Sequence, residues 1–238
     1  MVKKKVDNNI SMVTSGWSFA NIEKKFDNHI KKSIPYYEDI HNITIKISEF
    51  FNIDHSIFLD IGCSTGTLLK KFAKKYPKKN YKTKFIGIDS VASMIKEAKR
   101  INHDNRIKYI NKSIENTNLK DINFISSIFT IQFVPLSKRQ KIFNKIYKSL
   151  NKGGAFIMFE KVKAENGYLQ EIYDGIYEDF KLQNHFTESE IIQKSLSLRG
   201  KMITNTSQEN IEHLKKSGFK KINRIFKWFC FEGICCIK

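Results

Sequence analysis

Short apolar runs alternate with amphipathic segments through the middle of this chain. The run at 57–61 is apolar and is bounded by polar residues and glycine, which is typical of a strand buried on both faces of a parallel sheet. The segment at 91–101 instead places Met94, Ile95 and Ala98 on one helical face. This alternation over roughly 100 residues predicts a doubly wound α/β sheet.

The same pattern predicts the order of the elements. Strands are expected at 57–61, 85–89, 107–110, 122–133, 155–159, 222–228 and 229–237, of which the last two form a closing antiparallel hairpin. Helices are expected at 18–33, 36–52, 66–76, 91–101, 137–150, 164–183, 188–199 and 207–217. The sequence therefore predicts a seven-stranded, mostly parallel sheet.

Local signals mark several helix ends. Pro35 ends the first helix, and Thr187 and Thr206 each precede a glutamate by three residues, which predicts capping boxes. Ser137 stands in the same relation to Gln140 and predicts a third box. Gly218 follows the last helix, where a left-handed residue is favoured.

Length and composition favour one domain over 1–238. A chain of 238 residues with 41% hydrophobic content can bury a full core. We therefore expect an N-terminal helical cap at about 17–52 and a helical insert at about 164–217. The four cysteines have neither zinc-site nor disulfide spacing, so we expect a reducing cytoplasm and no metal. The basic N-terminus lacks an apolar segment, and no run is long enough for a membrane span, so we expect neither export nor membrane insertion.

The formal charge of +18 raises the question of a nucleic-acid partner. Only five of the 42 basic residues are arginine, whereas phosphate and base recognition favours the guanidinium fork. Paired lysines such as Lys70 and Lys71 are typical of solvated helix faces. The charge favours solubility and leaves a nucleic-acid partner open, and a homodimer is compatible with the sequence.

A glycine turn at 60–66 follows the first strand and leads into a helix. Such a turn brings backbone N–H groups and a helix N-terminus close to a ligand. Asp89 ends the next strand, where an acidic side chain can accept both hydroxyls of a ribose. Together these features predict a site for a cofactor that contains a nucleoside.

Two other kinds of site have similar sequence motifs. A dinucleotide site needs a glycine where Ser64 stands, so NAD is disfavoured. The residues 62–66 also fit the nucleophile elbow of an α/β-hydrolase, but no histidine follows a late strand. The hydrolase stays an alternative.

The motifs resemble those of one known family, the carboxy-S-adenosylmethionine synthases of tRNA wobble-uridine modification, within the class I methyltransferases. The resemblance implies a Rossmann-like class I methyltransferase fold and S-adenosylmethionine, or its carboxylated form, as the ligand. It extends nearly end to end, through 17–19, 26–30, 33–37, 60–64, 88–90, 129–133, 145–147, 150–155, 160–161, 179–181, 190–194 and 216–219.

The turn and the resemblance together imply a set of cofactor-binding residues. These are Tyr37, Asp60, Gly62, Cys63, Ser64, Gly66, Asp89, Ser90, Met94, Ser113, Ile114 and Ile128. Three positions depart from the family pattern, which has asparagine at Ile128, aspartate at Ser113 and, facing the product carboxylate, arginine at Ser195. Arg199 lies one helical turn beyond Ser195 and is the candidate replacement, so both are expected to face the substrate.

Some residues allow two interpretations. Gln132 faces the reacting centre or is a satisfied amide at a strand end. Tyr36 is interpreted as core packing, and Glu160 with Lys161 as a solvent-exposed pair. An aromatic cluster is expected to pack the last strands, and it consists of Phe226, Trp228, Phe229 and Phe231.

The function predicted first is transfer of the sulfonium methyl to a small acceptor, with no catalytic residue assigned. The lost arginine favours this prediction, because a buried carboxylate without its cation loses about 2–5 kcal/mol. The alternative, implied by the resemblance, is carboxy-S-adenosylmethionine synthesis from S-adenosylmethionine and prephenate. A further alternative is a component of an RNA-modifying assembly.

Overall fold

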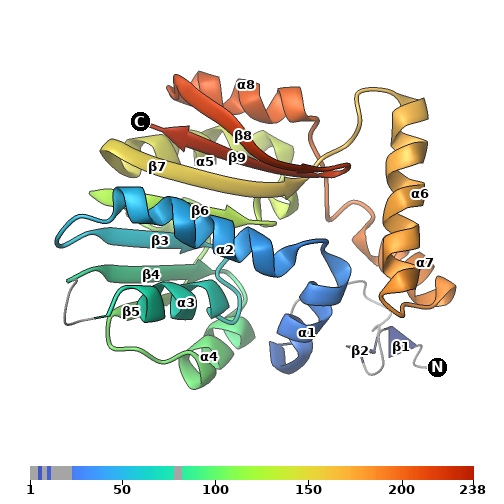
Figure 1. Cartoon of the computed structure of the whole chain (residues 1–238), viewed down its shortest axis with the longest axis horizontal. Helices are drawn as coiled ribbons and strands as arrows, with labels where there is room; N and C mark the ends of the chain where they lie inside the picture. Colours follow the sequence, from blue (N-terminus) through green and yellow to red (C-terminus); the bar gives the residue numbers. More distant parts are fainter. Residues whose placement is uncertain (1–4, 7–9, 12–22, 78–81) are drawn as a thin grey trace.

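A twisted seven-stranded sheet forms the centre of the molecule (Figure 1). The computed structural model describes residues 5–6, 10–11, 23–77 and 82–238. The sheet order is β5-β4-β3-β6-β7-β9-β8; the first five strands are parallel, and β9 and β8 close the sheet as an antiparallel hairpin. The strands are β3 (Ile57–Ile61), β4 (Lys84–Asp89), β5 (Ile107–Asn111), β6 (Ile122–Ile128), β7 (Leu150–Lys161), β8 (Lys221–Trp228) and β9 (Phe231–Ile237), and a separate short pair is β1 (Lys5–Val6) with β2 (Ile10–Ser11).

Helices cover both faces of the sheet. One face packs against α2 (Tyr37–Ser48), α3 (Thr67–Lys75) and α4 (Ala92–Ile101), and the other against α5 (Leu136–Ser149) and α8 (Ser207–Ser217). Neighbouring residues of β3 show the consequence, since Phe58 joins one apolar cluster and Leu59 the other. The predicted strand buried on both faces is confirmed.

Three helices lie beside the carboxyl ends of the parallel strands (Figure 1). They are α1 (Glu23–Ser33), α6 (Gly167–Gln183) and α7 (Glu188–Leu198). The three helices after β7 therefore lie in two places: α6 and α7 lie beside the strand ends, whereas α8 packs beside α5. The predicted start of the first helix, at 18–22, lies outside the described residues. Among the helices that the structure describes, none is long and apolar enough to cross a membrane.

Three predictions of local structure are wrong. β7 begins at Leu150, directly after α5, and not at 155. β6 ends at Ile128, not at 133, because the backbone turns at Phe129, with φ of 53°, into the short helix η3 (Ile131–Phe133). The box at Ser137 does not form, because α5 begins one residue earlier and Gln140 instead donates to the carbonyl of His213, on α8, at 3.1 Å.

The other predicted helix-end signals are confirmed. The boxes at Thr187 and Thr206 are both present, and Gly218 adopts φ of 113° after α8. Two further short helices are η1 (Glu49–Phe51), where the second predicted helix loses its α geometry, and η2 (Ile114–Asn116).

Candidate functional site

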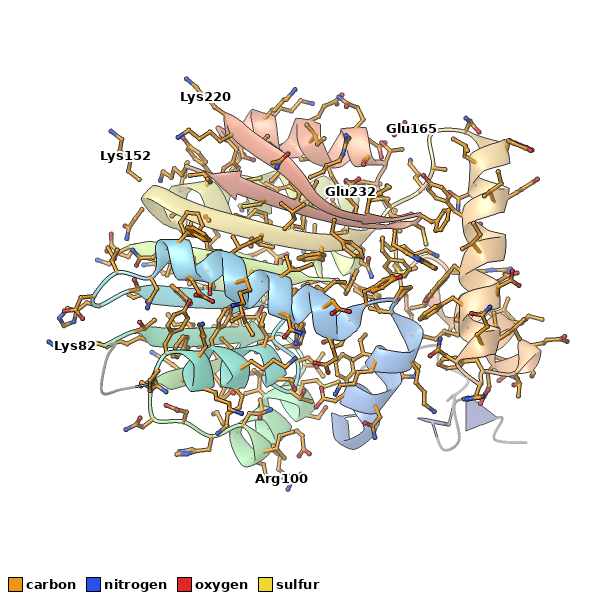
Figure 2. The ribbon with its side chains drawn as sticks, in the orientation of Figure 1. Lys82, Arg100, Lys152, Glu165, Lys220 and Glu232 are labelled. Carbon is orange, nitrogen blue, oxygen red and sulfur yellow. The ribbon has the colours of Figure 1, made fainter. Side chains whose placement is uncertain are left out.

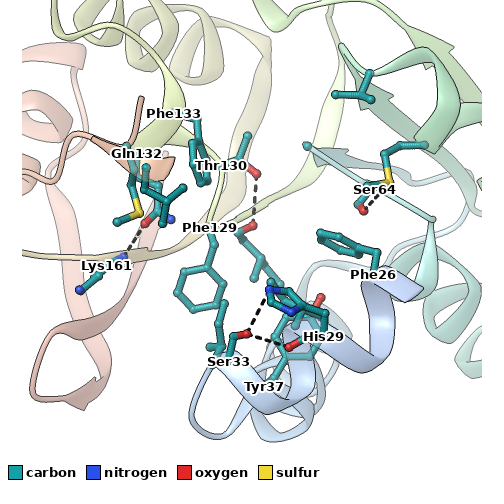
Figure 3. A pocket seen from close by; sticks show the side chains of 18 of the residues that line it. Phe26, His29, Ser33, Tyr37, Ser64, Phe129, Thr130, Gln132, Phe133 and Lys161 are labelled. Atoms are coloured by element: carbon teal, nitrogen blue, oxygen red, sulfur yellow. Dashed lines mark hydrogen bonds between the residues drawn. The ribbon is translucent and has the colours of Figure 1, made fainter. Parts of the chain in front are cut away.

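A cavity of about 710 Å³ opens where the carboxyl ends of β3, β4, β6 and β7 meet the helices α1, α6 and α7 (Figure 3). This is the edge at which open parallel sheets bind ligands. Fourteen of the fifteen residues predicted to bind cofactor or face substrate line it, all but Gly66. The topology therefore brings the predicted site together.

The glycine turn after β3 has the geometry that its sequence requires. Gly62 has φ of 72°, and its N–H donates to the carbonyl of Ile88 at 2.8 Å. A Cβ here would collide with the side chain of Thr130, so only glycine fits. Gly66, at φ of 79°, begins α3 and leaves room for the hydroxyl of Tyr109. Its part is to shape the turn, since it lies outside the cavity wall.

Asp89 ties the second strand end to this turn. One carboxylate oxygen accepts the N–H of Ser64 at 2.9 Å, and the other accepts the N–H of Val91 at 2.8 Å. Burial raises the pKa of Asp89, although both N–H groups act to lower it. Because each carboxylate oxygen can accept a second hydrogen bond, Asp89 remains able to bind two hydroxyls.

Asp60 is a second acidic side chain of the cavity wall, and it is buried. The hydroxyl of Ser126 donates to it at 2.7 Å. Burial raises the pKa of Asp60 to about 7; the charge of Asp89 acts in the same direction and the bond from Ser126 against it. Within the described ranges, Ser126 is the one hydrogen-bond partner of this carboxyl, and a buried carboxyl of this kind is suited to a cationic ligand.

The Asp60→Asn variant is expected to remove part of the pH dependence of stability in the ligand-free protein. In the wild type, the folded-state pKa of Asp60 lies above the ordinary value of 3.8. The stability that Asp60 contributes is therefore fully present below about pH 4 and is lost as the pH rises to about 7. Urea unfolding at about pH 5 and about pH 8 should show wild type losing roughly 3 kcal/mol more than the variant. Equal losses would contradict the assigned pKa.

The N-terminal helices contribute aromatic groups. Tyr37 begins α2, lines the cavity and packs against His41 with ring centroids 4.5 Å apart. Burial, and then the charges of Asp27 and Asp60, raise the pKa of the Tyr37 phenol. The interpretation of Tyr36 as core packing is wrong: this residue is 55% exposed, and its ring meets that of Phe226 with centroids 6.1 Å apart.

The interpretation of Glu160 as solvent-exposed is also wrong, since it is 3% exposed. Its carboxylate accepts the N–H groups of Thr130, Ile131 and Gln132 at 3.2, 2.8 and 3.0 Å. Burial raises the pKa of Glu160 to about 7 against these bonds. Glu160 thus holds the turn that forms one cavity wall.

Gln132 is in this turn, not in a strand, and is 7% exposed. Its side-chain oxygen accepts the N–H of Lys161 at 2.8 Å (Figure 3). It is therefore a satisfied amide that also lines the cavity. The aromatic cluster packs as predicted, for example Trp228 against Phe231 with centroids 6.0 Å apart.

Several cavity residues were missed by the sequence reasoning. Lys161 and Lys181 both lie over the ring of Tyr177, with Nζ 4.6 and 4.3 Å from its centroid. Lys194 contacts Nε2 of His29 at 3.3 Å. Two sequence signals could have indicated Lys161, Tyr177 and Lys181. Lys161 directly ends a parallel strand, and Tyr177 and Lys181 are four residues apart on one helix.

Comparisons with known proteins agree with this geometry. Residues 58–154 match the family described as methyltransferase domain. The carboxy-S-adenosyl-L-methionine synthase of Staphylococcus epidermidis is 39% identical over 93% of this chain and 97% of its own length. The synthase of the same name from Nautilia profundicola is 39% identical over 90% of each chain. Phosphoethanolamine N-methyltransferase 2 of Haemonchus contortus, solved with S-adenosyl-L-methionine, superposes with a TM-score of 0.63 at 13% identity, covering 96% of this chain and 61% of that one.

These findings confirm three predictions. The fold is that of a class I methyltransferase, the protein is an enzyme of the transferase class, and its cofactor is S-adenosylmethionine.

Proposed function

Because this chain belongs to the carboxy-S-adenosyl-L-methionine synthase family, we propose that it makes carboxy-S-adenosylmethionine from S-adenosylmethionine and prephenate. One observation carries the proposal. The similarity to the synthases extends over nearly the whole chain, whereas the general methyltransferase domain ends at 154. The cavity residues on α6 and α7 lie beyond that domain, in the part shared with the synthases.

The reaction balances without an oxidant. The sulfonium methyl loses a proton, and its carbon bonds to the carbon dioxide released by prephenate. The ring of prephenate also loses hydroxide, which takes up that proton and leaves as water, so the ring becomes aromatic as phenylpyruvate. The protein has to hold both substrates in contact and keep bulk water out. The cavity between the sheet edge and the helices α1, α6 and α7 suits both tasks.

The cavity wall also fits S-adenosylmethionine. Asp89 offers its free lone pairs to the ribose hydroxyls, beside the N–H groups of the glycine turn. Met94 and Ile114 supply an apolar surface for the adenine. Asp60 and the ring of Tyr37 place negative charge and an aromatic face where a cationic ligand is stabilised.

Plain methyl transfer is the second candidate, and Ser195 favours it. This position, which carries arginine in the family pattern, is an exposed serine at the cavity edge. Arg199 lines the same cavity one helical turn later and supplies the missing cation in the synthase proposal.

Mass spectrometry of the reaction products tests the proposal. Incubation of the protein with S-adenosylmethionine and prephenate should yield a nucleoside heavier by one carbon dioxide, together with phenylpyruvate. The control omits prephenate and should yield neither. Formation of S-adenosylhomocysteine and a methylated acceptor, with no carboxylated product, would instead support methyl transfer.

A further inference from the structure

Two ammonium groups share one aromatic ring at the α6 side of the cavity. Lys161 ends β7 and Lys181 is in the last turn of α6, and both lie over Tyr177. The ring is held in place, because its hydroxyl donates to the carbonyl of Ser33 at 2.9 Å and Phe231 packs edge-on at 5.1 Å. The two charges are therefore positioned by the fold.

The environment of these two charges in the described part of the chain is short of close acidic partners. Among the described residues, neither ammonium has a carboxylate within ion-pair distance. Burial, and then the charge of Lys161, lower the pKa of Lys181 to about 8, against the opposing charges of Glu178 and Asp174. A half-buried pair of like charges that face a cavity is stabilised by a bound anion.

The position of this pair separates it from the nucleoside end of the cavity. In the sheet order, β7 is three strands from β4, which carries Asp89. Neighbouring strands are spaced by about 4.8 Å, so the two strand ends are roughly 14 Å apart. An anion at Lys161 and Lys181 therefore lies apart from the ribose hydroxyls.

We propose that Lys161 and Lys181, positioned by Tyr177, bind a carboxylate of the organic acid that donates the carboxyl group. This inference rests on the proposed function and names the residues that select its second substrate. Lysine offers charged donors to a carboxylate without requiring the planar fork of arginine. The pair is a binding subsite of the same cavity.

Single variants Lys161→Met and Lys181→Met test the subsite. Each is expected to raise the KM for prephenate about tenfold, because a charge-assisted hydrogen bond is lost. The Kd for S-adenosylmethionine should change less than about twofold, which also shows that the variants fold. Lys181→Arg should restore most of the affinity for prephenate. The matched control is Lys152→Met. The Lys152 side chain projects into solvent near the N-terminal end of β7, the opposite end of the strand from Lys161 (Figure 2).

Calorimetric titration of prephenate into the protein saturated with S-adenosylmethionine separates this inference from the proposed function. Binding by wild type that each Met variant weakens supports the subsite even without turnover. Turnover to the carboxylated product with an unchanged KM in both variants would overturn the subsite and leave the proposed function standing. Absence of any prephenate binding to wild type would overturn both.

Discussion

Replacement of Arg139 by leucine is expected to lower the free energy of unfolding by about 3–5 kcal/mol. The side chain is 1% exposed. It donates to the carbonyls of Val134 and Gln132, at 2.9 and 3.2 Å, to Asn205 Oδ1 at 2.8 Å, and to the carbonyl of Ile203. The variant leaves these buried acceptors without a donor, so the turn after β6 and the segment before α8 lose their common support.

Urea unfolding measures this effect. The control is Lys141→Leu, an exposed lysine of the same helix, which should shift stability by about 0.5 kcal/mol or less. A loss below about 1 kcal/mol in Arg139→Leu would mean that water or other side chains satisfy the acceptors.

Replacement of Asp89 by alanine is expected to raise the Kd for S-adenosylmethionine about a hundredfold. Two hydrogen bonds to a charged acceptor, each about 1.5 kcal/mol, are lost with the ribose hydroxyls. The variant also removes the acceptor for the N–H groups of Ser64 and Val91, which shape the turn. Asp89→Asn keeps an acceptor oxygen in place and should fall between wild type and alanine.

Isothermal titration calorimetry gives these constants directly. Asp54→Ala is the matched control, because this exposed aspartate lies at the opposite end of β3 and should leave the Kd unchanged. An Asp89→Ala protein that binds S-adenosylmethionine as wild type does would remove Asp89 from the site.

The glycine turn and its acidic partner were predictable because both follow from local pattern. A run buried on both faces, a glycine turn and a strand-terminal aspartate are each read from consecutive residues. Parallel strands then bring their carboxyl ends to one edge, which places Asp60, Gly62 and Asp89 around one cavity. The capping boxes at Thr187 and Thr206 formed for the same reason, since a cap depends on residues three positions apart.

The predictions that failed depended on partners distant in the sequence. Glu160 is buried because three amides near 131, some thirty residues earlier, point at it after β6 and β7 pair. Gln140 bonds to α8 instead of capping α5, because α8 packs beside it.

The sequence by itself determined the elements, the doubly wound sheet and the cofactor end of the site, because these depend on apolar periodicity and on neighbouring residues. Only the tertiary structure decided which polar side chains are buried and which cations face the cavity. Lys161 and Lys181 meet over Tyr177 because α6 folds against the end of β7. Each segment carries a local signal of its own, but the shared electrostatics arise from a contact between the two segments that only the fold creates.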